Sequence, residues 1–317
     1  MTHTPHRDDT PSGKHTRLIS HGPEADHAFE ALLESHRARI QGLGDLPNAT
    51  VAQQLELLEQ LAEFELGRFL LQNRGLNAYW THHLVTYPAH AKTLEFSNDL
   101  HRLIYDSLPA VLATRERFGI FRQQLQARLT SKQHLASIPC GLMGDQLMLD
   151  YTQHSNINLL GVDLDEEALD GAQVLAQERG LADHLSLRHA DAWALNLDNE
   201  IDLLASNGLN IYEPDDAKVI DLYRVFFKAL KPGGTLVTSF MTPPPLLSPD
   251  SPWKMNLLEP KMLGVQQVLF TRILDAKWNV FRTHAQTRQQ LEAAGFVKIE
   301  FIDDHASLFP TVLASKP

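Results

Sequence analysis

The sequence predicts an α/β protein in which an N-terminal all-helical cap precedes a seven-stranded sheet. Apolar residues recur at helical spacing over residues 25–131, whereas residues 132–317 alternate short apolar runs with helical stretches. Near-continuous apolar strands separated by helices are typical of a parallel sheet that is covered on both faces. The last two runs are joined by a link too short for a crossover, so we expect the last strand to be antiparallel.

The helical cap follows a polar segment, residues 1–24, that lacks apolar periodicity and is predicted to be a mobile tail. Asn48 is the predicted N-cap of a long helix that ends near Gly75. The remaining cap helices are expected in three places: up to Pro88, around 89–106, and from Pro109 to about 129.

Seven apolar runs in the second part are the predicted strands, namely 134–139, 157–164, 185–190, 201–206, 234–240, 297–302 and 311–315. Residues 242–282 lie between the fifth strand and the last helix and are predicted to be an inserted lid. In such a sheet, ligands bind beyond the carboxyl ends of the strands. The site is therefore expected where these strands end.

Polar and small residues follow the first four strands. The first strand ends in Pro139, Cys140 and Gly141, and Gly144 opens the helix beyond them. Asp163 ends the second strand, 22 residues after Gly141, which suits an acid that binds ribose hydroxyls. Two further positions continue this edge, Asp191 after the third strand and Asn207 after the fourth. Asp163 could instead be a plain helix N-cap, and Asp191 a turn residue.

In this order, five segments resemble motifs of the class I S-adenosylmethionine-dependent methyltransferases, which have a Rossmann-like sheet. They are "LLGVDLDEEAL", "LRHADAWALNL", "IDLLASNGLNIYEPD", "LYRVFFKALKPGGTLVTSF" and "QQLEAAGFVKIEFI". The resemblance implies S-adenosyl-L-methionine as cofactor. The residues that it places around the cofactor are Asp163 and Leu164 at the ribose, Asp191, Ala192 and Trp193 at the adenine, and Asn207 near the methyl group.

The loop after the first strand departs from the family pattern. Pro139 or another non-acid stands where the family has an acid that meets the methionine amino group, and only Gly141 and Gly144 remain of the glycines. A small neighbour such as Cys140 could compensate for a missing glycine, so we interpret Pro139, Cys140, Gly141 and Gly144 as a diverged cofactor loop. A fold that no longer binds the cofactor remains an alternative.

Charge and hydropathy exclude some classes of binding partner. Net charge is −11, and residues 132–317 hold 24 acidic against 15 basic side chains, which disfavours nucleic acid. No apolar run approaches the roughly 20 residues that span a bilayer, and no signal peptide is recognised, so no membrane partner and a cytoplasmic location are expected. Cys140 is alone and no histidine spacing matches a metal site, so no metal is predicted.

Methyl transfer depends mainly on alignment and the exclusion of water, and a general base is required only for an acceptor group of high pKa. Tyr212 after the fourth strand and His83 in the cap are the candidate catalytic residues. The acidic surface and apolar lid favour a small, partly apolar methyl acceptor. A non-catalytic partner protein with this fold stays open, as does a nicotinamide-dependent oxidoreductase.

Overall fold

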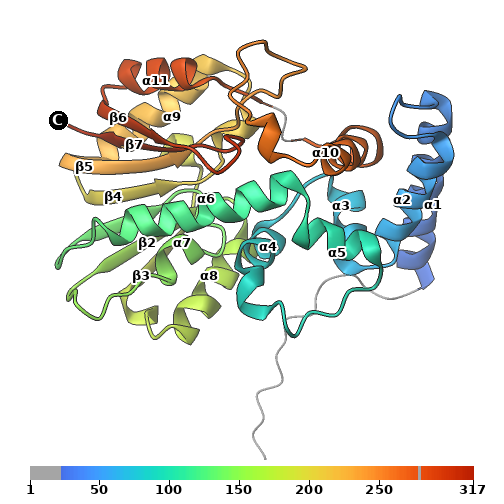
Figure 1. Cartoon of the computed structure of the whole chain (residues 1–317). Helices are drawn as coiled ribbons and strands as arrows, with labels where there is room; N and C mark the ends of the chain where they lie inside the picture. Colours follow the sequence, from blue (N-terminus) through green and yellow to red (C-terminus); the bar gives the residue numbers. More distant parts are fainter. Residues whose placement is uncertain (1–22, 278–279) are drawn as a thin grey trace, which may run out of the picture. The chain divides into compact units, whose positions relative to one another are not determined.

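The computed structural model describes residues 23–277 and 280–317 (Figure 1). By internal packing the chain divides into two compact units, one up to Leu58 and one from Glu59 onward. The predicted tail, residues 1–24, lies outside the described residues as far as residue 22, and α1 (Pro23–Leu43) begins at residue 23. The boundaries predicted at residues 24 and 131 stay predictions, because neither coincides with the packing division.

The single long helix predicted from Asn48 is two helices, α2 (Val51–Ala62) and α3 (Glu65–Asn73). Thr50 rather than Asn48 caps α2: its hydroxyl accepts from Gln53 N at 3.3 Å, while the Gln53 side chain accepts from Thr50 N at 2.9 Å. The chain turns back so closely that a Cβ at Gly67 would lie 2.0 Å from the carbonyl oxygen of Leu61. Only glycine permits that approach.

The remaining cap helices are α4 (Ala78–His90), α5 (Asp99–Asp106) and α6 (Pro109–Gln126). The Asn77 and Asn98 side chains cap α4 and α5, and Pro109 opens α6 as predicted. Pro88 does not end α4 but lies in its last turn. Within the described part of the predicted cap there is no strand, only an isolated bridge between Leu46 and Ala49.

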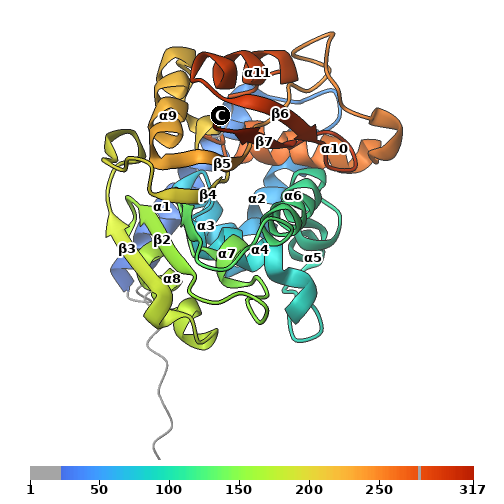
Figure 2. The ribbon, with the colours of Figure 1, turned by 90° about the vertical axis from the view of Figure 1, so that its left-hand side faces the viewer.

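The seven predicted strands all form, and they make one sheet in the order β3-β2-β1-β4-β5-β7-β6 (Figure 2). Their bounds are β1 (His134–Ser137), β2 (Asn158–Asp163), β3 (Leu185–His189), β4 (Ile201–Ser206), β5 (Leu230–Ser239), β6 (Val297–Ile302) and β7 (Thr311–Ser315). Strands β1 to β5 pair in parallel, and β7 pairs antiparallel with both β5 and β6. This confirms the predicted fold class and the antiparallel last strand.

Helices cover both faces of the sheet, as Figure 2 shows. On one face lie α9 (Asp216–Ala229) and α11 (His284–Ala293), whose Phe226 and Leu291 belong to one buried cluster. On the other lie α6, α7 (Gly144–Leu147) and α8 (Glu166–Glu178), whose apolar residues form a second cluster. Short 3₁₀ turns follow three strands or helices, at Ala182–His184, Ala192–Ala194 and Asn210–Tyr212.

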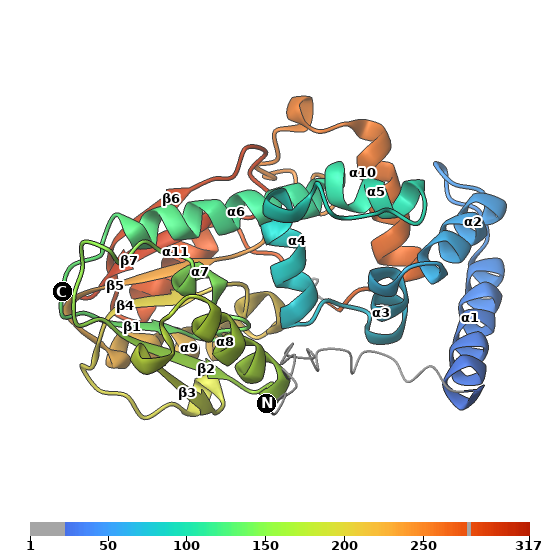
Figure 3. The same ribbon diagram turned by 90° about the horizontal axis from the view of Figure 1, so that it is seen from below.

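Helix α6 belongs to both the cap and the sheet. Its C-terminal half packs Phe121 and Leu125 on the sheet, whereas Ala110 and Ala113 lie in a separate apolar cluster with Met241. Figure 3 shows α6 continuing past the strand ends towards α10. The cap and the sheet therefore share a helix, which explains why packing does not separate them near residue 131.

The predicted insertion, residues 242–282, packs against that outer half of α6. It contains a 3₁₀ turn (Met255–Leu257), α10 (Pro260–Gln267) and a π-helical turn (Val268–Ile273). The Gln266 side chain accepts a hydrogen bond from Ala110 N at 2.7 Å, and partly buried Trp253 and Phe270 pack on the α6 cluster. The insertion and the outer half of α6 thus form one wall beyond the carboxyl edge of the sheet.

Candidate functional site

The loop between β1 and α7 retains glycine where the backbone requires it. Gly141 has φ +51°, and Met143 adopts the same left-handed region at φ +56°. Gly144 has a different reason, because a Cβ there would lie 2.7 Å from the His82 ring of α4. The two glycines are thus explained by the loop turn and by the close approach of α4.

Asp163 joins the loop to the end of β2. Its carboxylate accepts from Gly141 N at 2.9 Å and from Asp165 N at 3.1 Å. The alternative that Asp163 is the helix N-cap is wrong, since Asp165 caps α8 by accepting from Glu167 N at 3.0 Å. Leu164 beside it is 63% exposed, which leaves an apolar surface next to the carboxylate.

Asp191 lies next to Asp163 across the strand ends. Ala190 N donates to the Asp163 carbonyl at 3.0 Å, which brings the turn after β3 against the end of β2. Asp191 accepts from Trp193 N at 2.9 Å and so does serve the turn. Ala192 is buried, and the Trp193 indole donates to Lys218 O in α9 at 2.8 Å. The structure therefore gathers the predicted residues of β2 and β3 at one edge.

A buried acid lies under the loop. Asp145 in α7 is 6% exposed, and its hydrogen bonds to a side chain come from the Ser137 hydroxyl at 3.3 Å. Burial raises the pKa of Asp145 to about 6. Ser137 ends β1, so this carboxyl stands at the carboxyl end of the first strand although it comes from the following helix.

The segment after β4 is fixed by Arg282. This arginine, 3% exposed, donates to the carbonyls of Asn210 at 2.8 Å and Glu213 at 2.7 Å, and to the Asp216 carboxylate at 2.9 Å. The Asn207 side chain accepts from the Ser239 hydroxyl at 3.2 Å. Residues 207–213 are thereby tied to Arg282, to the first turn of α9 and to the end of β5.

Tyr212 projects from this segment with 52% of its surface exposed. Its hydroxyl end nevertheless lies in dense surroundings: burial raises the pKa of Tyr212, and the positive charge of Arg117 opposes that rise. The structure therefore places Tyr212 in reach of α6.

His83 lies elsewhere, inside the cap. Its Nδ1 is 2.8 Å from the Tyr105 hydroxyl, and its ring lies 4.4 Å from that of His90, tilted by 46°. Burial, reinforced by neighbouring histidines, lowers the pKa of His83 to about 4, so the ring is neutral at pH 7. The imidazole that meets the cofactor loop is that of His82. A catalytic role for His83 stays a prediction that these contacts do not support.

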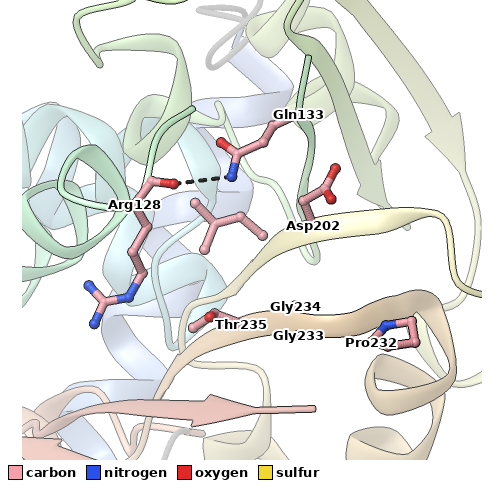
Figure 4. Close-up of a pocket in the computed structure, with 8 residues that line it drawn as sticks. Arg128, Gln133, Asp202, Pro232, Gly233, Gly234 and Thr235 are labelled. Carbon is pink, nitrogen blue, oxygen red and sulfur yellow. Dashed lines mark hydrogen bonds between the residues drawn. The ribbon is translucent and has the colours of Figure 1, made fainter. Parts of the chain in front are cut away.

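A reactive thiol, a metal site and a surface hollow are the other candidates for a functional site. Cys140 is buried, and burial raises the pKa of its thiol, so it is no activated nucleophile. No cluster of three potential metal ligands exists among residues 23–277 and 280–317. A hollow of about 310 Å³ is lined by Arg128, Asp202 and Gly233, among others, at the amino ends of the strands (Figure 4), opposite the edge described above.

Three residues of this edge escaped prediction: Arg117, Asp145 and Arg282. A signal existed for the first, since Arg117 falls at helical spacing between the apolar positions Ala113 and Phe121. None existed for Arg282, whose partners lie 66 to 72 positions away in the sequence.

Comparison with known proteins supplies the family. A family model described as a methyltransferase domain matches residues 140–234. The chain is 53% identical to a crystal structure from Bordetella parapertussis described as a possible exported protein, with a TM-score of 0.88 over 94% of this chain and 100% of that one. A search of curated proteins finds no match.

More distant structures include phosphoethanolamine N-methyltransferase 2 of Haemonchus contortus bound to S-adenosyl-L-methionine, at 14% identity and a TM-score of 0.46 over 62% of this chain and 52% of that one. Another is geranyl diphosphate C-methyltransferase of Streptomyces coelicolor A3(2), at 15% identity and 0.46 over 71% and 86%. None of the helices in the described part of the chain is long and apolar enough to cross a membrane. The matched model and the strand order identify the region around residues 140–234 as a class I S-adenosylmethionine-dependent methyltransferase domain, whose cofactor is S-adenosyl-L-methionine.

Proposed function

We propose that this protein is an active methyltransferase that transfers the methyl group of S-adenosyl-L-methionine in line to a small, partly apolar molecule. The observation that carries the proposal is the bond from Gly141 N to the Asp163 carboxylate at 2.9 Å. This bond ties the diverged loop to the acid that the resemblance places at the ribose, which supports the proposal that the loop still binds the cofactor.

The residues at this edge fit the cofactor. A carboxylate offers about four acceptor positions, so Asp163 can accept from two ribose hydroxyls while it holds Gly141 and Asp165. Asp191 would accept from the adenine amino group, and the exposed Leu164 would cover the base or sugar. Bound S-adenosyl-L-methionine supplies a methyl group on a positively charged sulfur.

Asp145 would supply the acid that the loop lacks. Pro139 carries no charge, but the Asp145 carboxyl reaches the end of β1 from α7 and bonds to Ser137. A buried carboxyl without a cationic partner is costly unless a ligand compensates it. The methionine ammonium group of the cofactor is such a ligand, and its charge would lower the pKa of Asp145.

The acceptor would bind beyond β4 and β5. Partly buried Ile211, Trp253 and Phe281 pack on the cluster of α6 there, which would exclude water from the reacting atoms. Tyr212 would orient an acceptor hydroxyl or amine. We propose a small molecule rather than nucleic acid or a membrane as the methyl acceptor, since residues 132–317 hold 24 acidic against 15 basic side chains. A cytoplasmic location stays a prediction, and the relative from Bordetella parapertussis is described as a possible exported protein.

Calorimetric titration of the full chain with S-adenosylhomocysteine and with NAD tests the cofactor part. We expect binding of S-adenosylhomocysteine and none of NAD. Saturable binding of NAD alone would identify an oxidoreductase instead. If neither S-adenosylhomocysteine nor NAD binds, a non-catalytic partner protein is favoured. Turnover is then sought by transfer of labelled methyl groups to a panel of small acceptors.

A further inference from the structure

Arg117 occupies a position that its helix reserves for apolar side chains. It lies on the buried stripe of α6 between Ala113 and Phe121, four positions from each. Ala113 packs in the outer cluster and Phe121 on the sheet, so Arg117 stands at the level where the strands end. Only 8% of its surface is exposed. A guanidinium here requires an explanation other than surface solubility.

This guanidinium has no hydrogen-bonding partner among the described residues. Its Nε is buried and unpaired, and no carboxylate in the described chain lies within ion-pair distance of it. Its close neighbour is the face of the Phe309 ring, 5.3 Å away. Burial lowers the pKa of Arg117 to about 10, so the side chain remains charged at neutral pH.

Asp304 does not neutralise Arg117. Its negative charge acts on Arg117 from a distance, but its carboxylate already accepts from the backbone N–H groups of Ala306 at 3.2 Å and Phe309 at 2.5 Å. Arg117 therefore keeps its hydrogen-bonding fork free. Burying an unpaired charge costs free energy, which a bound anion would recover.

We propose, building on the function proposed above, that Arg117 anchors an oxyanion of the methyl acceptor, either a carboxylate or a phosphate monoester. Both anions match the planar fork of a guanidinium with two parallel hydrogen bonds. Tyr212 lies within the electrostatic reach of Arg117 and belongs to the rigid segment after β4. The anion would thus be fixed on one side of the acceptor and the methylated atom on the other.

The neighbouring hollow does not compete for this anion. It measures about 610 Å³ and is lined by α6 and the β6–β7 link, but Arg117 is not among its lining residues. Asp106, Glu116 and Glu259 stand around it and would repel an anion. The anion is therefore expected on the side of α6 that faces Tyr212 and Phe309.

The test uses the full chain saturated with S-adenosylhomocysteine, with benzoate and phenyl phosphate as anionic probes and benzamide and phenol as neutral counterparts. We expect both anions to bind more tightly than their counterparts, and their relative affinity distinguishes a carboxylate from a phosphate acceptor. Arg117→Met should weaken anion binding about 10- to 100-fold and leave benzamide binding unchanged. Arg117→Lys should be intermediate, because it keeps the charge but loses the fork.

Arg128→Met is the matched control, since it removes one positive charge at the opposite edge of the sheet. It should not change anion binding. Equal affinity of the wild-type protein for anions and neutral probes would overturn the inference, as would full anion affinity in Arg117→Met. If Arg117→Met lowers Tm, Arg117→Lys distinguishes the two explanations. If Arg117 is only a structural cation, Arg117→Lys should bind benzoate as tightly as the wild-type protein does. Failure of the wild-type protein to bind S-adenosylhomocysteine would instead refute the proposed function.

Discussion

Arg282 and Arg117 are both buried at the carboxyl edge of the sheet, yet their surroundings differ completely. Arg282 saturates its guanidinium with the carbonyls of Asn210 and Glu213 and the carboxylate of Asp216. Arg117 has an aromatic face beside it and an unpaired Nε. The first arrangement stabilises the fold by itself, whereas the second is complete only with a further negative group.

The difference separates two parts of the same edge. The segment after β4 is held by contacts within the protein, so its shape is fixed before a ligand arrives. The wall formed by α6 instead carries the Arg117 guanidinium, whose Nε has no hydrogen-bonding partner in the described part of the protein. Preorganised segments that carry one unsatisfied group bind ligands without rearrangement, and the ordering cost is met during folding.

Arg282→Met should give the largest effect, because it removes the three hydrogen bonds by which one buried guanidinium ties together the carbonyls of Asn210 and Glu213 and the carboxylate of Asp216. We expect the free energy of unfolding to fall by about 3–5 kcal/mol. Urea denaturation measures it. Arg224→Met, which breaks an exposed pair with Asp221, is the control and should cost no more than about 1 kcal/mol. Arg117→Met should leave the free energy of unfolding unchanged or raise it. If it lowers the free energy of unfolding as much as Arg282→Met does, the two arginines do not differ in this way.

The sequence predicted the strands and the last strand's direction because apolar runs and short links are local signals. It also predicted Asp163 and Asp191 at neighbouring strand ends, since topology brings carboxyl ends together. It could not predict which imidazole would meet the loop: His82 and His83 are adjacent, and only the rotation of α4 selects His82.

Long-range packing also limits what periodicity can predict. The apolar period changes near residue 131, where the sequence predicts a domain boundary, but α6 packs Phe121 and Leu125 on the sheet, so helical spacing does not show that this helix also covers the sheet. Asp145 gives no local signal, because its hydrogen bond to Ser137 joins α7 to the end of β1. Such contacts depend on packing geometry that periodicity does not encode.

Asp145→Asn extends the comparison to a second buried charge that lacks a partner of opposite charge. The pKa of Asp145 is raised to about 6 in the fold from an ordinary value of 3.8. The stability linked to this group is therefore complete below pH 3.8 and is lost as pH rises through about 6. At pH 7.5 the variant should be more stable than the wild-type protein by up to about 3 kcal/mol, and at pH 3.5 the difference should vanish.

Unfolding by urea at both pH values measures this difference, with the exposed Asp170→Asn as control. Binding gives a second readout. Asp145→Asn should weaken S-adenosylhomocysteine but not 5′-methylthioadenosine, which lacks the ammonium group. A variant that is neither more stable at pH 7.5 nor selective between the two ligands would show that Asp145 is an ordinary core residue.

Asp163 is an exception to the contrast between partnered Arg282 and unpartnered Arg117. Its carboxylate has backbone partners, and we still expect it to bind a ligand. A hydrogen bond to a charged group contributes about 1.5–3 kcal/mol, so Asp163→Ala should weaken S-adenosylhomocysteine about 10- to 100-fold. Its 5′-methylthioadenosine affinity should fall equally, since both ligands carry the ribose. Asp163→Asn should be intermediate. Asp165→Ala is the matched control: it removes the observed cap of α8 and should lower Tm with affinity unchanged in the folded protein. If Asp163→Ala behaves like Asp165→Ala, then Asp163 only holds the loop, and partnered groups at this edge are structural without exception.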